Sequence, residues 1–330
     1  MTTLGKLTLR KGHVLCGMST KFAITNYLQI IMCMLGQSKV YSEASQMLKE
    51  LLHIDVSGMQ IQRVSTYYGE MINPLIEKNI ISCIPKLEDV QKDDDIYVMV
   101  DGSMIFIRDE GWKEIKLGRV FNGNKIVPIN KNRSELVESV YVSHMGSVDE
   151  FFPKLERHLV DYKRKIIIGD GAKWIWNWAE DNYPNATQIL DFYHAKEKLV
   201  LFANHQFKDE VKRKKWVEEQ SSKLKDDKVE QVINDLQKTR SSNQNAKEYK
   251  EKAIKYYLEH EDRMLYKTYM DKGILIGSGA IEAAHRSVLQ QRMKLSGQKW
   301  TVKGANAIAN LRCYRKSRAW NMVENIIKAA

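Results

Sequence analysis

The sequence predicts a mixed α+β fold, with a helical N-terminal region and a helical insertion. Three observations support this prediction. Residues 1–90 show helical periodicity, and residues 195–272 form a dense run of charges without proline. Between these stretches lie short apolar runs separated by turn residues, which are typical of strands. The strands first follow one another through turns and then alternate with helices, which indicates a mixed sheet.

The length of the chain, 330 residues, is about twice that of a typical domain, so more than one structural unit is expected. We predict a helical region over residues 1–90 and the first part of a core over 91–194. A helical insertion should follow over 195–272, and the core should be completed over 273–330.

The chain carries a net charge of +11, from 52 Lys and Arg against 41 Asp and Glu. This surplus favours an anionic partner, and nucleic acid is the commonest one. The alternative is that the chain is one of the many basic proteins without such a partner, because charge alone does not identify a ligand.

The four cysteines are widely separated and form no C-x-x-C pair: Cys16, Cys33, Cys83 and Cys313. They match neither a zinc site nor a disulfide framework, which indicates a reducing compartment. No apolar run approaches the roughly 20 residues that a membrane span needs. We therefore expect a cytoplasmic protein that does not enter a membrane.

The first region contains a pattern that resembles a helix-turn-helix. Residues 41–52 place Ala44, Leu48 and other apolar side chains on one helical stripe. After a short break, Ser57 and Gln60 have the spacing of a capping box, which predicts the start of a second helix. Its exposed side chains would contact DNA, namely Gln60, Gln62 and Arg63. The alternative is an ordinary small helical bundle.

The core begins with an apolar run, residues 96–100, that we expect to end as a strand at Asp101. A second buried strand, residues 165–169, is expected to end at Asp170. The remaining predicted elements are strands at 104–107, 113–121, 137–142 and 187–190, and helices at 148–162 and 172–182. The insertion should hold three or four helices, with a loop at 241–245. A loop at 277–279 should lead into a helix at 280–294, and a basic helical tail should follow it.

Carboxylates at two strand ends suggest a metal site. Asp101 and Asp170 are each followed by glycine, which allows close approach from outside, and Mg²⁺ prefers oxygen ligands. Glu282 falls in the first turn of a helix beside basic residues. The alternatives are two ordinary turns and a helix-capping glutamate. Three such carboxylates could hold two Mg²⁺ ions, or Mn²⁺ in their place, about 3.5–4 Å apart for phosphodiester chemistry. No P-loop, dinucleotide or metalloprotease motif competes with this interpretation.

Two further groups of residues have possible functions. Asp191 and His194 follow the strand at 187–190 and could face the acidic centre, unless Asp191 simply caps a helix. Residues 283–318 contain no Asp or Glu, so this stretch could bind phosphates, or it could be a solvated face. Its candidate DNA contacts are Arg286, Arg292, Lys294, Lys299 and Trp300, of which the tryptophan could instead be a packing residue.

Taken in order, these motifs resemble those of bacterial insertion-sequence transposases of the DDE class. The set is Val100-Asp101-Gly102, Gly169-Asp170-Gly171-Ala172, Asp191-x-x-His194 and Gly277-Ser278-Gly279-Ala280-Ile281-Glu282. The similarity is to the ISKra group, with the ISLre group as a neighbour and Mutator-like and hAT enzymes as distant relatives. It extends over nearly the whole chain.

The resemblance implies an RNase H-like catalytic core and a metal-binding triad of Asp101, Asp170 and Glu282, with His194 and Asp191 in support. It implies binding of double-stranded DNA, at element ends and target, by at least a dimer, in a nucleoid-associated protein. The implied reaction is metal-dependent cleavage at element ends followed by strand transfer. Two alternatives remain: a nuclease of the same fold without strand transfer, and a domesticated, non-catalytic DNA-binding protein.

Overall fold

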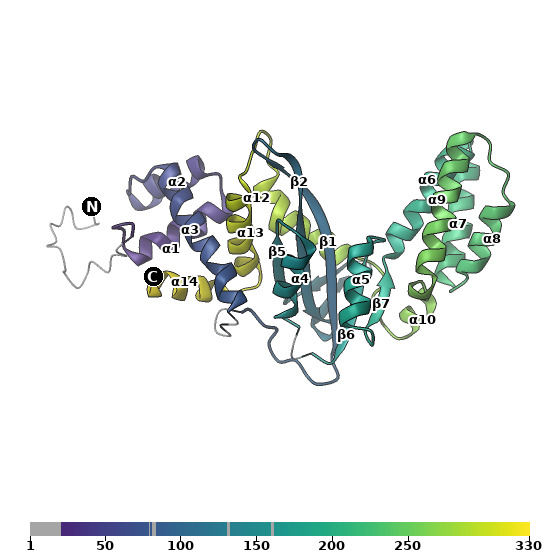
Figure 1. Cartoon of the computed structure of the whole chain (residues 1–330), viewed down its shortest axis with the longest axis horizontal. Helices are drawn as coiled ribbons and strands as arrows, with labels where there is room; N and C mark the ends of the chain where they lie inside the picture. The colour runs from purple at the N-terminus through teal and green to yellow at the C-terminus, as the bar shows by residue number, and fades with distance from the viewer. Residues whose placement is uncertain (1–20, 79, 81–83, 131–132, 160–161) are drawn as a thin grey trace. The chain divides into compact units, whose positions relative to one another are not determined.

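The computed structural model describes residues 21–78, 80, 84–130, 133–159 and 162–330 (Figure 1). The chain divides into two compact units. Unit 1 comprises the described residues up to Asp94, together with Gly102–Tyr162 and Ala283–Ala330. Unit 2 comprises Asp95–Asp101 and Lys163–Glu282.

The main sheet has five strands, in the order β5-β2-β1-β6-β7. They are β1 (Asp95–Ile107), β2 (Gly111–Asn122), β5 (Val140–His144), β6 (Arg164–Gly169) and β7 (Thr187–Leu190). β2 and β5 pair antiparallel, whereas β1, β6 and β7 pair parallel. Numbered along the chain, the order is third, second, first, fourth, fifth, which is the topology of an RNase H-like sheet. The predicted fold class is therefore confirmed.

Strand β1 differs from the prediction, because the two strands expected at 96–100 and 104–107 are one continuous strand. Asp101 therefore lies within β1 and not in a turn after it. The pairing of β1 with β6 nevertheless stops at Met99, opposite Ile168. A small second sheet, β3 (Ile126–Asn130) with β4 (Arg133–Leu136), was not expected and displaces the start of β5 to Val140.

In unit 1 helix packing involves both ends of the sequence. The helices are α1 (Asn26–Ser38), α2 (Tyr41–Leu52), α3 (Gly58–Glu77), α4 (Val148–Glu156), α13 (Val302–Lys316) and α14 (Trp320–Ala329). α13 packs against α3, α1 and β5. The contact with α3 is close at Gly69, where an added Cβ would lie 2.3 Å from the carbonyl oxygen of Ala307. Asn310 donates a hydrogen bond to the Gly69 carbonyl at 3.0 Å.

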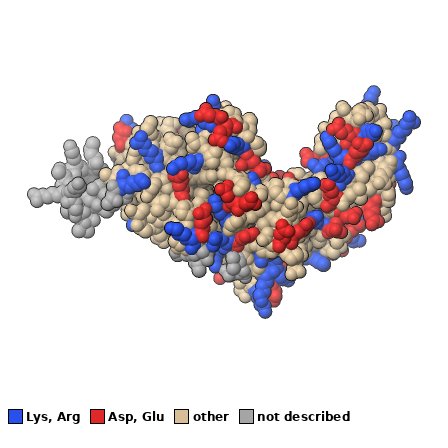
Figure 2. Space-filling model, viewed as in Figure 1, with Lys and Arg blue, Asp and Glu red and all other residues tan. Residues whose placement is uncertain are grey.

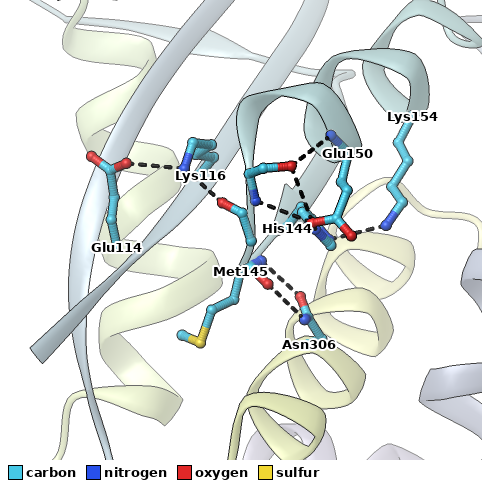
Figure 3. A network of polar contacts seen from close by, with 9 residues as sticks. Glu114, Lys116, His144, Met145, Glu150, Lys154 and Asn306 are labelled. Carbon is cyan, nitrogen blue, oxygen red and sulfur yellow. Dashed lines mark hydrogen bonds and ion pairs between the residues drawn. The ribbon is translucent and has the colours of Figure 1, made fainter. Parts of the chain in front are cut away.

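A network of polar side chains, of which Lys116, His144 and Lys154 are buried, connects β2, β5 and α4 in unit 1 (Figure 3). Nε2 of His144 lies 3.2 Å from Glu150, and Nδ1 lies 3.0 Å from the ammonium of Lys154. Lys116 donates to the Gly146 carbonyl at 2.9 Å. Because Nδ1 faces an ammonium, it acts as the acceptor, so the imidazole of His144 is neutral with its proton on Nε2.

In unit 2 the predicted insertion is helical. It contains α6 (Phe192–Gln206), α7 (Glu210–Lys225), α8 (Val229–Lys238), α9 (Gln244–His260) and the short α10 (Tyr266–Asp271), drawn in green in Figure 1. α6 packs against α7 and α9, and α8 packs against the same two helices. Asn243 caps α9 within the predicted loop. Helix α5 (Lys173–Asn182) also belongs to this unit and follows β6.

The helix predicted at 280–294 is divided into three parts. It comprises α11 (Gly279–Ala284), a π-helical turn (His285–Gln290) and α12 (Gln291–Met293). π-helical turns inside helices are frequent at functional sites.

The cysteines at 16 and 83 lie outside the described residues, and Cys33 and Cys313 are buried free thiols. No helix in the described part of the chain combines the length and apolarity that a membrane crossing requires.

Candidate active site

Three aspartates of unit 2 lie side by side across three neighbouring parallel strands. β1, β6 and β7 run parallel, with Met99 opposite Ile168 and Gly169 opposite Leu190. Asp101 lies two residues after Met99, and Asp170 lies two residues after Ile168, so these two aspartates lie opposite each other. Asp191 lies one residue after Leu190, as Asp170 does after Gly169. Neighbouring strands are about 4.8 Å apart. The register therefore aligns Asp101, Asp170 and Asp191 on three adjacent strands.

The electrostatics of Asp170 reflect this proximity. Burial raises the pKa of the Asp170 carboxyl above its usual range, and the negative charge of Asp101 raises it further. The charges of His194 and Lys198 act in the opposite direction, as does a 2.9 Å hydrogen bond from the backbone amide of Ala172. A pair of carboxylates that repel each other in this way would be stabilised by a bound cation.

Asp191 organises the neighbouring histidine. It is fully buried and caps α6, accepting a hydrogen bond from the backbone amide of His194 at 2.6 Å. The same carboxylate lies 3.1 Å from Nδ1 of His194. This hydrogen bond is the main cause of a raised pKa of His194, and the charges of Asp170 and Asp101 add to it. Asp191 therefore caps the helix, as in the capping alternative, and also contacts the imidazole of His194.

Burial by itself would raise the pKa of Asp191, but its hydrogen bonds outweigh that effect and the net shift is downward. The bonds come from His194 and from the backbone amide of Ser278. A buried carboxylate that remains ionised keeps the imidazole oriented and favours its protonated form.

Glu282 is exposed in the first turn of α11. Its backbone amide donates to the carbonyl of Ser278 at 3.2 Å, so it lies one helical turn from the residue that contacts Asp191. The charges acting most strongly on Asp170 and His194 come from Asp101 within β1, from the residues that follow β6 and β7, and from α6, and Glu282 is not among them. The structure thus brings together Asp101, Asp170, Asp191 and His194, with Glu282 near but outside this group.

The carboxylates of this site suit a divalent cation that takes two ligands from the protein. Mg²⁺ commonly takes one or two carboxylates and completes its shell with waters and substrate phosphates. Asp101 and Asp170 provide such a pair. Among the described residues, no group of three or more His, Cys, Asp or Glu side chains is placed to hold a metal ion.

Two residues near the site were not identified from the sequence. The ring of Tyr256, from α9, lies over Gly171, where an added Cβ would be 2.1 Å from the ring. Its hydroxyl is buried and, among the described residues, has no hydrogen-bond partner of ordinary geometry. Lys198 lies over the same ring, 4.8 Å from its centre. The glycine after Asp170 was expected to leave room for a substrate, but here that room is filled by Tyr256. No local pattern links a tyrosine in the insertion to this site.

The predicted DNA contacts lie in unit 1 and differ in exposure. Gln62 and Arg63 are exposed on α3, and Gln60 is partly buried. Ser57 caps α3 as predicted, accepting from the Gln60 amide at 3.2 Å. On the face of the molecule shown in Figure 2, positive and negative side chains are interspersed, so net charge alone does not mark a DNA-binding surface there.

Within residues 283–318, the stretch without Asp or Glu, some of the predicted DNA contacts are exposed and others are buried. Arg286, Lys294 and Lys299 are exposed. Trp300 is 7% exposed, and its indole donates to the Met293 carbonyl at 3.0 Å, so its ring packs inside the unit and does not offer a face to a base. Arg292 is also buried, at 1% exposure.

Comparisons with known proteins place the chain in a family. The Drosophila P element transposase strand transfer complex is similar in structure at 10% identity, covering 88% of this chain and 78% of that one. The TM-score is 0.30, a level that does not bear on function. No curated protein matches the sequence. A model of the uncharacterised protein family UPF0236 matches residues 83–326, well over half of the chain. The chain therefore belongs to UPF0236.

Proposed function

We propose that this protein is a DDE-type DNA transposase of the insertion-sequence kind that its motifs resemble, related to the ISKra group. The observation that carries the proposal is the alignment of Asp101, Asp170 and Asp191 on adjacent parallel strands. The charge of Asp101 acts on Asp170, and both act on His194. The proposed reaction is cleavage at element ends, followed by attack of the freed 3′-hydroxyl on target DNA.

In this proposal Asp101 and Asp170 bind Mg²⁺, or Mn²⁺, and Glu282 joins them as the third carboxylate when DNA is bound. When bound, two ions would stabilise the attacking and leaving oxygens of the phosphodiester. Asp191 orients His194 and favours its protonated form. A protonated imidazole at this position can neutralise charge on a phosphate oxygen or hold a proton near the leaving oxygen.

The proposed DNA surface belongs to unit 1. Gln62 and Arg63 would read base edges from α3, while Arg286, Lys294 and Lys299 would contact phosphates. Phosphate contacts position a protein on DNA, whereas base contacts determine sequence preference. Because two element ends must be paired, we propose that the protein acts at least as a dimer on DNA.

A strand-transfer assay tests the proposal. The substrates are the DNA segments that flank the gene, which contain the element ends, and a supercoiled target plasmid, with Mg²⁺ or EDTA. Wild-type protein should nick the ends and join them to the target only with the metal. Asp101→Asn and Asp170→Asn should lose both activities while they retain DNA binding, because an amide cannot neutralise a divalent ion. Asp181→Asn is the matched control, since Asp181 is exposed near the far end of α5, about 12 Å along the helix axis from its first residue, Lys173.

The outcomes separate the alternatives. Cutting without joining would favour a nuclease of the same fold, and DNA binding without either activity would favour a domesticated DNA-binding protein. Glu282→Gln tests the third ligand: full activity of this variant would leave a site of two aspartates. Activity of both aspartate variants would overturn the transposase proposal.

A further inference from the structure

A pocket of about 260 Å³ lies within unit 1, in the part of the protein to which we assign DNA binding. Segments distant in sequence line it: the start of α2, α3, the turn after β1, α12 and the first turn of α13. Its polar and aromatic lining residues include Tyr41, Gln62, Arg108, Arg292, Lys299 and Trp300. No acidic residue lines it, whereas three cationic residues do. The composition of the pocket favours an anion.

The guanidinium of Arg292 is the unusual feature of this pocket. It is only 1% exposed, and its Nε donates to the carbonyl of Gly36 at 3.1 Å. The rings of Tyr41 and Trp300 lie 4.9 and 5.0 Å from its centre. Its Nη1 and Nη2 atoms have no hydrogen-bond partner within the part of the chain that the structure describes.

Buried donors without partners are costly. An unsatisfied buried polar group is unfavourable, and a charged one more so, so such groups are rare in folded proteins. An oxyanion in the pocket would supply the acceptors that Nη1 and Nη2 lack, because a guanidinium matches the spacing of two phosphate oxygens. The two nitrogen atoms of the buried Arg292 guanidinium that are unpaired among the described residues therefore indicate that a ligand binds there.

Other groups around the pocket also favour an anion. Lys299 and Arg108 are exposed cations, and the main chain of Arg108 is fixed by a 2.7 Å hydrogen bond from its amide to the Trp300 carbonyl. Thr301, the N-cap of α13, and Gly304 in its first turn also line the pocket. The positive end of the dipole of this 15-residue helix thus faces the same space.

We propose that this pocket binds a phosphate group of a DNA strand, with the guanidinium of Arg292 at its base. The volume is below the roughly 300–1,000 Å³ of sites for drug-sized ligands, which suits a phosphate with part of its sugar. Gln62, a proposed base contact, lines the same pocket, and phosphate contacts position such a helix on the duplex. The choice of DNA as the source of the phosphate rests on the proposed function.

The main test measures the salt dependence of binding to a labelled DNA duplex, by fluorescence anisotropy in EDTA so that no cleavage occurs. Lys299→Ala and Arg108→Ala should each make the negative slope of log K against log salt shallower by about 0.9, the value for one lost phosphate contact. Arg292→Lys keeps the charge but loses the paired donors, so it should weaken binding about tenfold or more with a similar slope. Lys78→Ala is the control, because Lys78 ends α3 about 24 Å from Gln62 along the helix axis and does not line the pocket.

A second measurement distinguishes the sources of the phosphate. Inorganic phosphate, compared with chloride at equal ionic strength, should raise the melting temperature of the wild type but not of Arg292→Met. Lys299 and Arg108 are exposed, so their variants test the pocket even where Arg292 variants fold poorly.

Unchanged slopes for both exposed variants would overturn the proposal. Stabilisation by phosphate with unchanged DNA binding would overturn the DNA assignment and favour a small phosphorylated ligand. Loss of strand transfer alone would leave this result standing, because binding is measured without catalysis. A wild type that does not bind DNA would overturn both proposals.

Discussion

The carboxylate of Asp191 accepts a hydrogen bond from the backbone amide of Ser278, 87 residues further along the chain. The same buried carboxylate caps α6 and contacts the imidazole of His194. One side chain therefore holds both the histidine of the candidate site and the loop that leads to the helix of Glu282.

Asp191→Asn should destabilise the protein. An amide offers one acceptor oxygen in place of two, so either the His194 side or the Ser278 amide loses its partner, at a cost of about 1–3 kcal/mol. The pKa of His194 should fall, because the main cause of its rise is removed. Thermal unfolding and an NMR titration of His194 measure the two effects, with Asp181→Asn as control. An unchanged pKa of His194 would contradict this role of Asp191.

The destabilisation by Asp191→Asn should depend on pH. The pKa of Asp191 is lowered, so its contribution is present above its ordinary value of about 3.9 and is lost as pH falls through the lowered value. The pKa of His194 is raised, so its contribution is present below about 6.5 and is lost as pH rises through the raised value. The difference in unfolding free energy from wild type should be largest between about pH 4 and 6.5. A difference that is the same at every pH would count against the ion pair.

Asp170→Asn should leave stability unchanged or increase it at neutral pH without divalent ions. The pKa of Asp170 is raised, so stability is lost as pH rises through that raised value, and the amide removes this loss. Asparagine can still accept the hydrogen bond from Ala172 through its Oδ1 atom. Melting temperatures in EDTA at pH 7 and below pH 4 check this, and the advantage of the variant should vanish in acid. A fall of several degrees at pH 7 would show that the carboxylate is not under repulsion.

Replacing Gln62 and Arg63 with Ala should weaken binding to element-end DNA more than binding to random duplex. Both side chains are exposed on α3, where they can reach base edges, and each well-made base contact contributes about 1–3 kcal/mol of discrimination. Anisotropy with the two duplexes measures the ratio, and Lys78→Ala on the same helix serves as the control. Equal losses on both duplexes would mean that α3 contributes only packing or non-specific attraction.

Lys154→Met should raise the pKa of His144. Burial lowers that pKa first, and the positive charge of Lys154, 3.0 Å away, lowers it further (Figure 3). Because the pKa of His144 is lowered, its contribution to stability is lost as pH falls through that value, and the variant should lose less stability in acid. An NMR titration of His144 checks the shift, with the exposed Lys49→Met as control. A pKa that stays the same would mean that the ammonium does not act on the imidazole.

Helix positions were predictable where the signals are local. The helix at 41–52 and the strand at 187–190 have the predicted bounds, and Ser57 caps α3 through a bond to a residue three positions away. The helix expected at 148–162 ends earlier, at Glu156. Such signals act between residues a few positions apart, so a single sequence contains them completely.

The candidate site was only partly predictable. Asp101 and Asp170 were identified because an apolar run precedes each and a glycine follows. Asp101 was nevertheless expected after its strand and lies inside β1. Whether a strand stops at Asp-Gly depends on whether a neighbouring strand continues to pair with it, and this is not a local property.

By itself the sequence determined most of the helices and strands of the main sheet, the apolar faces and the acidic residues at the sheet, because periodicity and turn chemistry are local. The tertiary structure decided which of these residues meet. It aligned Asp101 with Asp170 and Asp191, placed Tyr256 over Gly171, and buried Arg292 between Tyr41 and Trp300. The burial of a charged or aromatic side chain depends on which distant segments pack around it, so the sequence left Arg292 as a candidate DNA contact and left Trp300 open between a DNA contact and a packing residue.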